Sequence, residues 1–456
     1  MMPTPGRVIV AGGGLAGIAA AVRLAEAGVA VTLIEATNRL GGRAGSFTDP
    51  VTGDTIDNCQ HVTMAACAAY LDLLGRLGAR EDLAWTASQW WIEEGGRTSV
   101  IQPGTLPAPL HLAPALMRAA FVPLKHAGAL ARAGRAMLRS NRVAHEHETF
   151  AAYLTRLDQP EDLVRKVWEP VVVGACNMTC DRVAASVALH VFQEGLFANA
   201  GSSAIGVPRV PLVKLYERVA GLIECAGGDT RLGERVETVE SEAVTLISGD
   251  RLTGDRVVCA LPLAATLRAV APNARDARFD GLKRIGHSPI LGVHITFDRP
   301  VLGVPHAVLV DRPTHWLFRK DNEGRVIHAV ASAADAWVGL SPEQRVDRVL
   351  ADIGACLPRS CDARIERAVP VLEKRATFAA TPESEPLRPD VEGESGLMLA
   401  GDYVRTGWPA TMEGATRAGY AAAASILGVP RSELIPPARP IGWLARRLGL
   451  RHPPAA

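Results

Sequence analysis

The chain opens with short apolar runs separated by glycine- and alanine-rich stretches. The run RVIV at 7–10 is long enough for a buried parallel strand. An Ala- and Leu-rich stretch then runs to Ala27-Gly28, and glycine there adopts the left-handed conformation that ends many helices. The run VAVTLIEA at 29–36 predicts a second strand that ends on Glu35. This order predicts a βαβ unit and therefore an α/β fold.

A similar arrangement recurs near the other end of the chain. LMLA at 397–400 predicts a buried strand, Gly401-Asp402 follow it, and an Ala-rich helix is expected from Met412. Between the two ends, residues 86–205 are expected to be mainly helical. Residues 276–375 contain strand-like runs such as PILGVHITF and RVIHAVAS.

The first strand–helix junction carries the pattern Gly12-x-Gly14-x-x-Gly17. Gly12 allows the tight turn, Gly14 lets the backbone approach a pyrophosphate, and Gly17 permits close helix–strand packing. The helix N-terminus offers free N–H groups to the phosphates, and Glu35 accepts from ribose hydroxyls. The glycine pattern alone is weak evidence, but here the expected strand, helix and acidic residue accompany it. We therefore predict an adenine dinucleotide site at Gly12, Gly14, Leu15, Ala16, Gly17, Glu35 and Ala36.

Two further segments are expected to reach the same ligand. The stretch ATNRLGGRAGSF places Arg39, Gly42 and Arg43 in a loop suited to the phosphates and ring of a long ligand. An ordinary tight turn with solvated arginines is the alternative. Near the C-terminal end, Gly401 and Asp402 follow a strand, and Asp402 is expected to accept from a ribityl hydroxyl. The helix start at Thr411 and Met412 would offer N–H groups to a ring.

The glycine motif with Glu35, then RLGGRA, then GDYVRTGWPATMEGATRAG together resemble the flavin amine oxidase and phytoene desaturase superfamily. The resemblance implies FAD as cofactor. Covalent members attach it through a cysteine near the C-terminal motif, and this chain has none after Cys361, so noncovalent binding is expected. The resemblance also implies that the backbone of Val236 contacts the adenine end of FAD. The implied fold is a Rossmann-like FAD-binding domain interleaved with a substrate domain of mixed sheet and helices.

The resemblance and the order of elements together divide the chain into interleaved parts. We expect residues 1–85, 206–275 and 376–435 to build the FAD-binding domain. Residues 86–205 and 276–375 are expected to build the substrate and membrane-docking domain, which would enclose an apolar tunnel. Residues 436–456 are expected to form a basic tail.

The resemblance becomes narrower at DNCQHV (57–62) and at WEPVVVGACNMTCDRVAASVALHVFQEGLF (168–197). These segments look like the hydroxysqualene dehydroxylases of bacterial hopanoid pathways. The resemblance implies reduction of hydroxysqualene to squalene, with reduced flavin as the hydride source. Relatives often read Leu-Asn-Thr-Pro-Pro where this chain has CNMTC at 176–180. The local loop therefore departs from the family, although Asn177 remains.

The segment IDNCQHVTM gathers an acid, two amides, a thiol and an imidazole between apolar flanks. The resemblance implies that Asp57, Asn58, Gln60 and His61 face the flavin or the reacting end of the tunnel. Loss of hydroxide from an allylic alcohol needs a proton donor, and we expect His61 to be that acid. Asp57 would orient His61 or stabilise the allylic cation. The alternative is that Asp57 and Asn58 hold a local turn while His61 hydrogen-bonds inside the core.

Charge is balanced overall but uneven along the chain. Lys+Arg (49) and Asp+Glu (48) nearly cancel, which argues against nucleic acid as a partner. Residues 107–142 and 439–452 are basic and amphipathic, and no Asp or Glu occurs from Gly95 to His145. These stretches predict docking on an anionic membrane, with solvated helix faces as the alternative.

The remaining expectations concern compartment and other ligands. The N-terminus shows no secretory signal, no apolar run is long enough to span a bilayer, and the eight cysteines are scattered. We therefore expect an intracellular protein, cytoplasmic and peripheral on the inner face of the cytoplasmic membrane. The cysteines lack zinc-site spacing, so no metal site is predicted. No second nucleotide motif appears, so the electron donor is left unassigned.

Three other functions remain open from the sequence. A carotenoid desaturase of the phytoene type would move the hydride in the opposite direction, from polyene precursor to flavin. An amine oxidase would need an aromatic cage, and aromatic residues make up only 5% of the chain. A non-catalytic isoprenoid-binding escort protein would be expected to have a degraded flavin site, whereas here the motif residues are all present.

Overall fold

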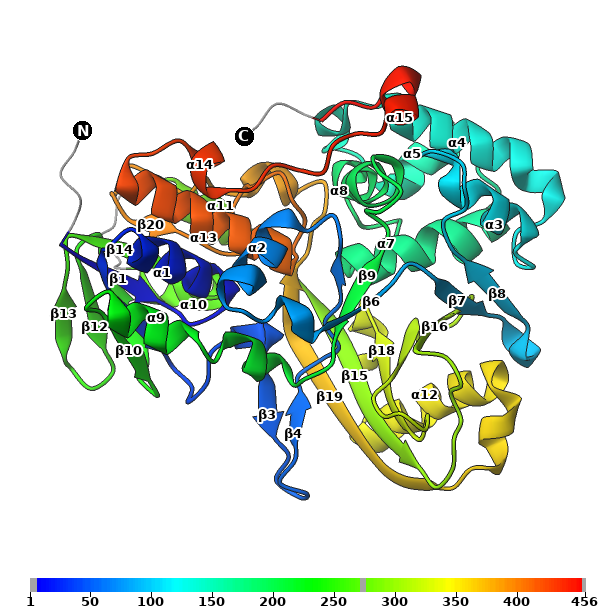
Figure 1. Cartoon of the computed structure of the whole chain (residues 1–456), viewed down its shortest axis with the longest axis horizontal. Coiled ribbons are helices and arrows are strands. Elements are labelled where there is room, and N and C mark those ends of the chain that lie inside the picture. The colour runs from blue at the N-terminus through cyan, green and yellow to red at the C-terminus, as the bar shows by residue number, and fades with distance from the viewer. Residues whose placement is uncertain (1–5, 271–275, 453–456) are drawn as a thin grey trace.

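The computed structural model describes residues 6–270 and 276–452. The outermost parts of the predicted FAD-binding domain and basic tail (1–5, 271–275 and 453–456) lie outside the described residues. Figure 1 shows a sheet with α1 and α13 at one end of the molecule, a second sheet at the other end, and a helical layer beside that second sheet.

The first sheet is parallel and its strands come from distant parts of the chain. Its order is β10-β2-β1-β14-β20, and every neighbouring pair is parallel. The strands are β1 Arg7–Ala11, β2 Ala30–Glu35, β10 Asp229–Leu232, β14 Arg256–Cys259 and β20 Met398–Leu399. The strands expected at 7–10 and 29–36 are confirmed, and the one expected at 397–400 is reduced to two residues. The α/β fold follows from this sheet.

Two helices pack closely together beside the parallel sheet. They are α1 Leu15–Glu26 and α13 Met412–Leu427. A Cβ built on Gly419 of α13 would lie 2.2 Å from the carbonyl oxygen of Ala16, so glycine is required where the helices cross. This contact joins the two ends of the chain, as Figure 1 shows.

Smaller elements surround the parallel sheet. Short strands form an antiparallel sheet (β11 Val236–Val239, β12 Ala243–Leu246, β13 Arg251–Thr253), a hairpin (β3 Ser46–Thr48, β4 Thr55–Asp57) and a three-stranded group (β5 Thr63–Met64, β9 Ile205–Pro208, β6 Leu83–Thr86). The helices are α2 Ala68–Arg76, α9 Val219–Cys225, α10 Leu263–Ala269, α11 Arg278–Leu282 and α14 Arg431–Leu434.

The second sheet is mixed, as expected for the substrate part. Its order is β19-β15-β18-β17-β16-β7-β8, and β16 pairs with β7 in parallel while the other pairs are antiparallel. The strands are β7 Gln89–Ile92, β8 Thr98–Ile101, β15 His287–Phe297, β16 His306–Leu309, β17 Trp316–Arg319, β18 Val326–Ala331 and β19 Ile365–Phe378. Helix α12 (Pro342–Cys356) covers one face through a buried core that includes Val349 and Ile353.

The expected helical region is present but interrupted. It contains α3 Ala113–Arg118, α4 Ala127–Arg139, α5 Phe150–Arg156, α6 Glu161–Leu163, α7 Glu169–Cys176 and α8 Ala185–His190. Wider π-helical turns at Val164–Trp168 and Val191–Phe197 precede α7 and follow α8. The tail helix α15 (Trp443–Leu448) packs on α4. Within the described residues, no helix is long and apolar enough to cross a membrane.

Candidate functional site

A large cavity begins at the glycine-rich loop after β1 and extends beneath the helical layer. Its volume is about 1290 Å³, above the roughly 300–1,000 Å³ typical of a single small-ligand site. Every predicted cofactor-binding residue except Gly17 lies on its wall. These are Gly12, Gly14, Leu15, Ala16, Glu35, Ala36, Arg39, Gly42, Arg43, Val236, Gly401, Asp402, Thr411 and Met412.

The N-terminus of α1 fits a phosphate group. No side chain caps this end, and its first turn contains no acid, so its N–H groups and positive dipole end are available to an anion. A Cβ built on Gly14 would meet no protein atom within 4 Å, because it would enter open space. Gly17 instead packs inside, since its Cβ would lie 1.9 Å from the carbonyl oxygen of Gly12. Gly17 therefore has the packing role that was expected from the sequence.

Glu35 stands at the end of β2 beside this loop. Its carboxylate accepts from the N–H of Gly13 at 2.9 Å and from the N–H and hydroxyl of Thr37, both at 2.9 Å. These bonds fix the carboxylate at the cavity wall, and Oε2, which accepts only from Gly13, keeps a lone pair. Glu35 therefore both shapes the glycine loop and presents an acceptor to a ribose.

The second glycine pair lies against the first loop. Gly41 and Gly42 both have positive φ (106° and 58°), and a Cβ on Gly42 would lie 3.1 Å from the Cα of Gly14. Arg43 follows and forms two hydrogen bonds with Asp402, Nη2–Oδ1 at 2.6 Å and Nη1–Oδ2 at 3.0 Å. Sequence reasoning placed both residues at the ligand but missed that they pair with each other.

The N-terminus of α13 forms another part of the wall. Thr411 is its N-cap and accepts from the N–H of Gly414 at 3.1 Å, which leaves the first N–H groups of the helix unused. The neighbouring Glu413 was not predicted. Its fully buried carboxylate accepts from the N–H groups of Ala69 and Tyr70 at 3.0 and 2.8 Å, and from Arg417 at 2.6 Å. The signal available in the sequence was an acidic residue at the start of an Ala-rich helix.

The structure corrects the expectation for Asp57. Its side chain is 5% exposed and does not belong to the cavity wall. Its carboxylate accepts from the Ser46 hydroxyl at 2.8 Å and from the Leu212 N–H at 3.0 Å, and Lys320 lies 3.7 Å away. Asp57 therefore holds the β3–β4 hairpin against the chain at Leu212. This is the local structural role that the sequence left open.

Asn58 and His61 do line the cavity. The Nδ1 atom of His61 lies 3.0 Å from the carbonyl oxygen of Cys59, not beside Asp57. A carbonyl oxygen only accepts, so the neutral imidazole carries its hydrogen on Nδ1 and leaves Nε2 as an acceptor. Burial lowers the pKa of His61 from its usual 6.5. The imidazole is therefore neutral at pH 7 and donates from Nε2 only when protonated.

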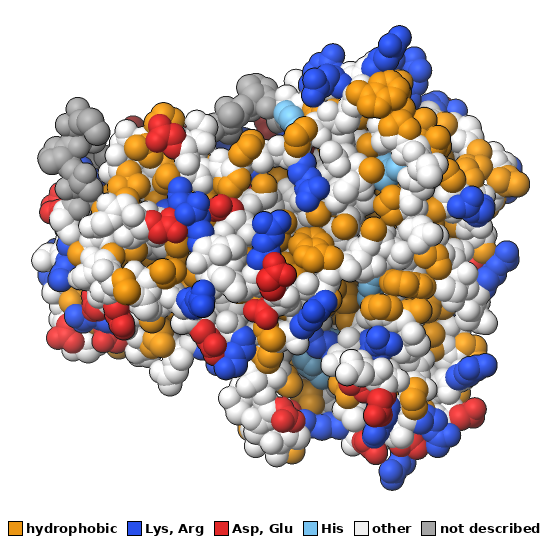
Figure 2. Space-filling view, in the orientation of Figure 1, with side chains coloured by type: hydrophobic (Ala, Val, Ile, Leu, Met, Phe, Trp, Pro, Cys, Tyr) orange, Lys and Arg blue, Asp and Glu red, His pale blue; other side chains and the backbone are white. Residues whose placement is uncertain are grey.

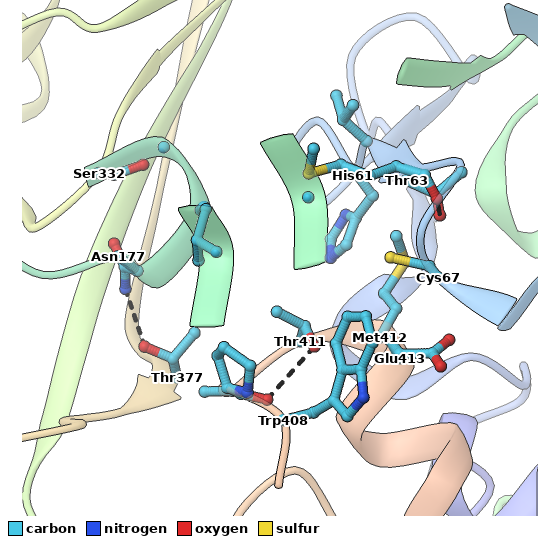
Figure 3. Close-up of a pocket in the computed structure, with 18 of the residues that line it drawn as sticks. His61, Thr63, Cys67, Asn177, Ser332, Thr377, Trp408, Thr411, Met412 and Glu413 are labelled. Carbon is cyan, nitrogen blue, oxygen red and sulfur yellow. Dashed lines mark hydrogen bonds between the residues drawn. The ribbon is translucent and has the colours of Figure 1, made fainter. Parts of the chain in front are cut away.

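The far part of the cavity is mostly apolar. Its wall includes Leu112, Leu116, Leu130, Val171, Phe192 and Leu448, supplied by α3, α4, α7, the π-helical turns and α15. Figure 3 shows the part where the two ends meet, with His61, Thr63 and Cys67 on one side and Asn177 and Thr377 on the other. Polar groups thus gather at the junction between the glycine loops and the apolar end.

Similar proteins by sequence include a hydroxysqualene dehydroxylase and a phytoene desaturase. The chain is 28% identical over 435 residues to a hydroxysqualene dehydroxylase from Sinorhizobium fredii, covering 92% of this chain and 98% of that protein. It is 24% identical over 466 residues to a 15-cis-phytoene desaturase from Synechococcus elongatus, covering 92% and 96%. Among solved structures, cyclohexylamine oxidase from Brevibacterium oxydans has a TM-score of 0.68 at 19% identity, covering 93% and 99%. At this identity, the similarity to cyclohexylamine oxidase shows the fold alone.

Residues 15–427 match the family described as flavin-containing amine oxidoreductases. The cofactor is FAD, and the site fits it on structural grounds. The open space at Gly14 and the uncapped α1 terminus suit the pyrophosphate, Glu35 the ribose, and the unused N–H groups of α13 the ring. The chain is therefore an FAD-dependent oxidoreductase and belongs to the flavin-containing amine oxidoreductase family.

Proposed function

We propose that this protein reduces hydroxysqualene to squalene. Reduced FAD supplies a hydride when bound, and the substrate loses its hydroxyl group as water. The balance is hydroxysqualene plus one hydride and one proton, giving squalene and water. The observation that carries this proposal is the long, mostly apolar extension of the cofactor cavity, with polar groups gathered at the junction. Such a cavity suits a hydrocarbon chain that carries one polar group at the reacting carbon.

The relatives support the same substrate. Hydroxysqualene dehydroxylases from Sinorhizobium fredii and Zymomonas mobilis are each 28% identical to this chain and covered almost end to end. The phytoene desaturases that also match are named for a hydrocarbon substrate. A desaturase needs no proton donor for a leaving hydroxyl, so polar groups at the junction favour the dehydroxylase.

His61 is proposed as the proton donor. Among the described residues, Nε2 makes no hydrogen bond, and the ring points toward Thr411 and Trp408 in Figure 3. In the imidazolium form both nitrogens carry hydrogen, so Nδ1 stays bonded to Cys59 while Nε2 donates to the leaving hydroxyl. Asn58 lines the same wall and is proposed to contact the reacting end. Asp57 holds the segment in place from behind.

Docking on an anionic membrane is proposed for the face that carries α4 and α15. Apolar side chains are exposed there, with Leu124 at 71% and Trp443 at 68%. Arginines of α4 and α15 accompany them, and Figure 2 shows basic and hydrophobic side chains gathered over α15. Leu110 and Leu448 from this region also line the cavity. A lipid substrate would therefore have a short path from the bilayer to the apolar end.

The experiment that tests the reaction is an anaerobic half-reaction. The purified holoenzyme is photoreduced, hydroxysqualene is added, flavin reoxidation is followed in the visible spectrum, and the lipid is extracted. Stoichiometric reoxidation with squalene formed is the expected result. The proposal would be replaced by the desaturase if the flavin stayed reduced with hydroxysqualene while the oxidised enzyme was bleached by phytoene.

A further inference from the structure

Thr377 on the cavity wall belongs to a buried hydrogen-bond network that fixes the direction of its hydroxyl group. Asn177 ends α7 in the left-handed conformation (φ 53°) and is 4% exposed. Its Nδ2 donates to the carbonyl oxygen of Ser288 at 3.1 Å and to Oγ1 of Thr377 at 3.0 Å. Its Oδ1 accepts from the N–H of Ala333 at 2.7 Å. Figure 3 shows the Asn177–Thr377 bond at the edge of the cavity.

The orientation of the Asn177 amide follows from its partners. The Ala333 N–H only donates, so the amide oxygen must face it. The Ser288 carbonyl only accepts, so the amide nitrogen must face Ser288 and Thr377. Both partners require the same orientation, and the Ser288 hydroxyl donates in turn to the backbone carbonyl oxygen of Asn177 at 2.7 Å. The amide is therefore locked from two directions.

This lock determines what Thr377 offers to the cavity. Its Oγ1 already accepts from Asn177, so the hydroxyl hydrogen points elsewhere. Among the described residues, that hydrogen has no acceptor, and Thr377 lines the cavity. The nearby lining is apolar on the strands behind it, with Ile290, Trp316 and Val330. Thr377 thus presents a neutral donor to the cavity beside an apolar wall.

We propose that Thr377 is the residue that binds the hydroxyl oxygen of the substrate and makes the site specific for hydroxylated over fully hydrocarbon isoprenoids. The proposal rests on the function proposed above and names the residue that recognises its substrate. A donor with no protein acceptor is left unpaired by a hydrocarbon, whereas an alcohol oxygen satisfies it. The product lacks this oxygen, so the same contact favours binding of substrate over product. Thr377 is a positioning residue, since a neutral alcohol is too weak an acid to be the proton donor.

The test compares binding to the oxidised holoenzyme, in which no turnover occurs. Dissociation constants for hydroxysqualene and squalene are measured by perturbation of the flavin spectrum in detergent. The wild type is expected to bind hydroxysqualene roughly tenfold more tightly than squalene. Thr377→Val, which keeps the shape but removes the hydroxyl, is expected to bind both lipids equally, and Thr377→Ser to restore the preference.

A matched control lies on the opposite wall. The Thr63 hydroxyl also lines the cavity but donates to the carbonyl oxygen of Met64 at 3.3 Å, so its hydrogen is already used. Thr63→Val is therefore expected to keep the preference. With reduced enzyme, Thr377→Val is expected to raise KM for hydroxysqualene far more than it changes kcat.

The outcomes separate this inference from the reaction itself. An unchanged preference in Thr377→Val, or no preference in the wild type, would overturn the role of Thr377 even if hydroxysqualene were turned over. A preference that depends on Thr377 would uphold it even if the half-reaction failed. Flavin content and melting temperature of each variant are measured alongside, and Thr377→Ala, which also removes the hydroxyl, carries the test if Thr377→Val does not fold.

Discussion

Arg43 and Asp402 form a two-pronged ion pair across 359 positions of the chain, with Nη2–Oδ1 at 2.6 Å and Nη1–Oδ2 at 3.0 Å. Arg43 comes from the second glycine loop and Asp402 from the end of β20, and both line the cavity. Arg43 also donates to the carbonyl oxygen of Ala376 at 2.8 Å, at the end of β19. One guanidinium therefore links the two sheets at the cofactor.

Removing one partner of this pair is expected to affect both folding and FAD retention. Arg43→Ala leaves the carboxylate of Asp402, whose side chain is only 9% exposed, without its charge partner. We expect a loss of about 2 kcal/mol in the free energy of unfolding, because a largely buried charge is left unpaired. Urea unfolding and flavin release into a filtrate measure the two effects.

The control for Arg43 is an exposed ion pair with similar geometry. Arg251 and Glu240 pair at 2.7 Å with side chains 51% and 43% exposed. Arg251→Ala is expected to change the free energy of unfolding by less than about 1 kcal/mol and to retain FAD. Equal effects of the two substitutions would contradict the linking role of Arg43.

Alanine substitutions of Gly14 and Gly17 in the first loop are expected to have different effects. Gly14→Ala places its Cβ in open cavity space, so we expect an apoprotein of normal melting temperature that binds FAD more weakly, by roughly tenfold or more. Gly17→Ala would bring its Cβ to 1.9 Å from the Gly12 oxygen, so we expect poor folding. Calorimetry of the apoproteins and FAD titration distinguish the two. Tight FAD binding by Gly14→Ala would argue against a phosphate at this turn.

The sequence predicted those parts of the site that depend on local order. The βαβ unit, the glycine turns and the start of α13 are encoded within short segments, so their positions follow from spacing alone. Contacts between residues far apart in the chain were not predicted. Asp57 was expected at the reacting end because the family resemblance implied it. Its binding partner, the N–H of Leu212, lies 155 positions away and leaves no local pattern that would have corrected this.

The polar contacts at Thr377 were even harder to predict from the sequence, because they also join residues that are far apart in the chain. Its network joins α7, β15, β19 and the turn after β18, and Asn177 and Thr377 are 200 positions apart. Asn177 stood out in the sequence only as a residue shared with relatives. Its function depends on three partners that meet after both sheets have formed, which no periodicity in the chain records.

The proposed membrane face leads to a prediction about Trp443. This side chain is 68% exposed on a tail helix with Arg446 and Arg447 in its last turn. Trp443→Ala is expected to reduce sedimentation with anionic phosphatidylglycerol vesicles several-fold, because the interfacial ring is lost. Binding of the wild type should fall with added salt and with purely zwitterionic vesicles.

Trp85 offers a matched control for the vesicle experiment. It is 41% exposed on β6, outside the proposed docking stretches. Trp85→Ala is expected to sediment with vesicles as the wild type does. Equal loss in both variants, or no binding by the wild type, would remove the α4–α15 face as the docking surface.

The pH dependence of the half-reaction tests His61 as the acid. Burial lowers its pKa below 6.5, so the donating imidazolium becomes more populated as pH falls below that value. The rate of flavin reoxidation by hydroxysqualene is therefore expected to rise as pH falls through this window, until His61 is fully protonated. His61→Gln is expected to lower the rate about 10²-fold and to abolish that rise. Full turnover by His61→Gln with FAD bound, or an unchanged pH profile, would assign the proton to another donor.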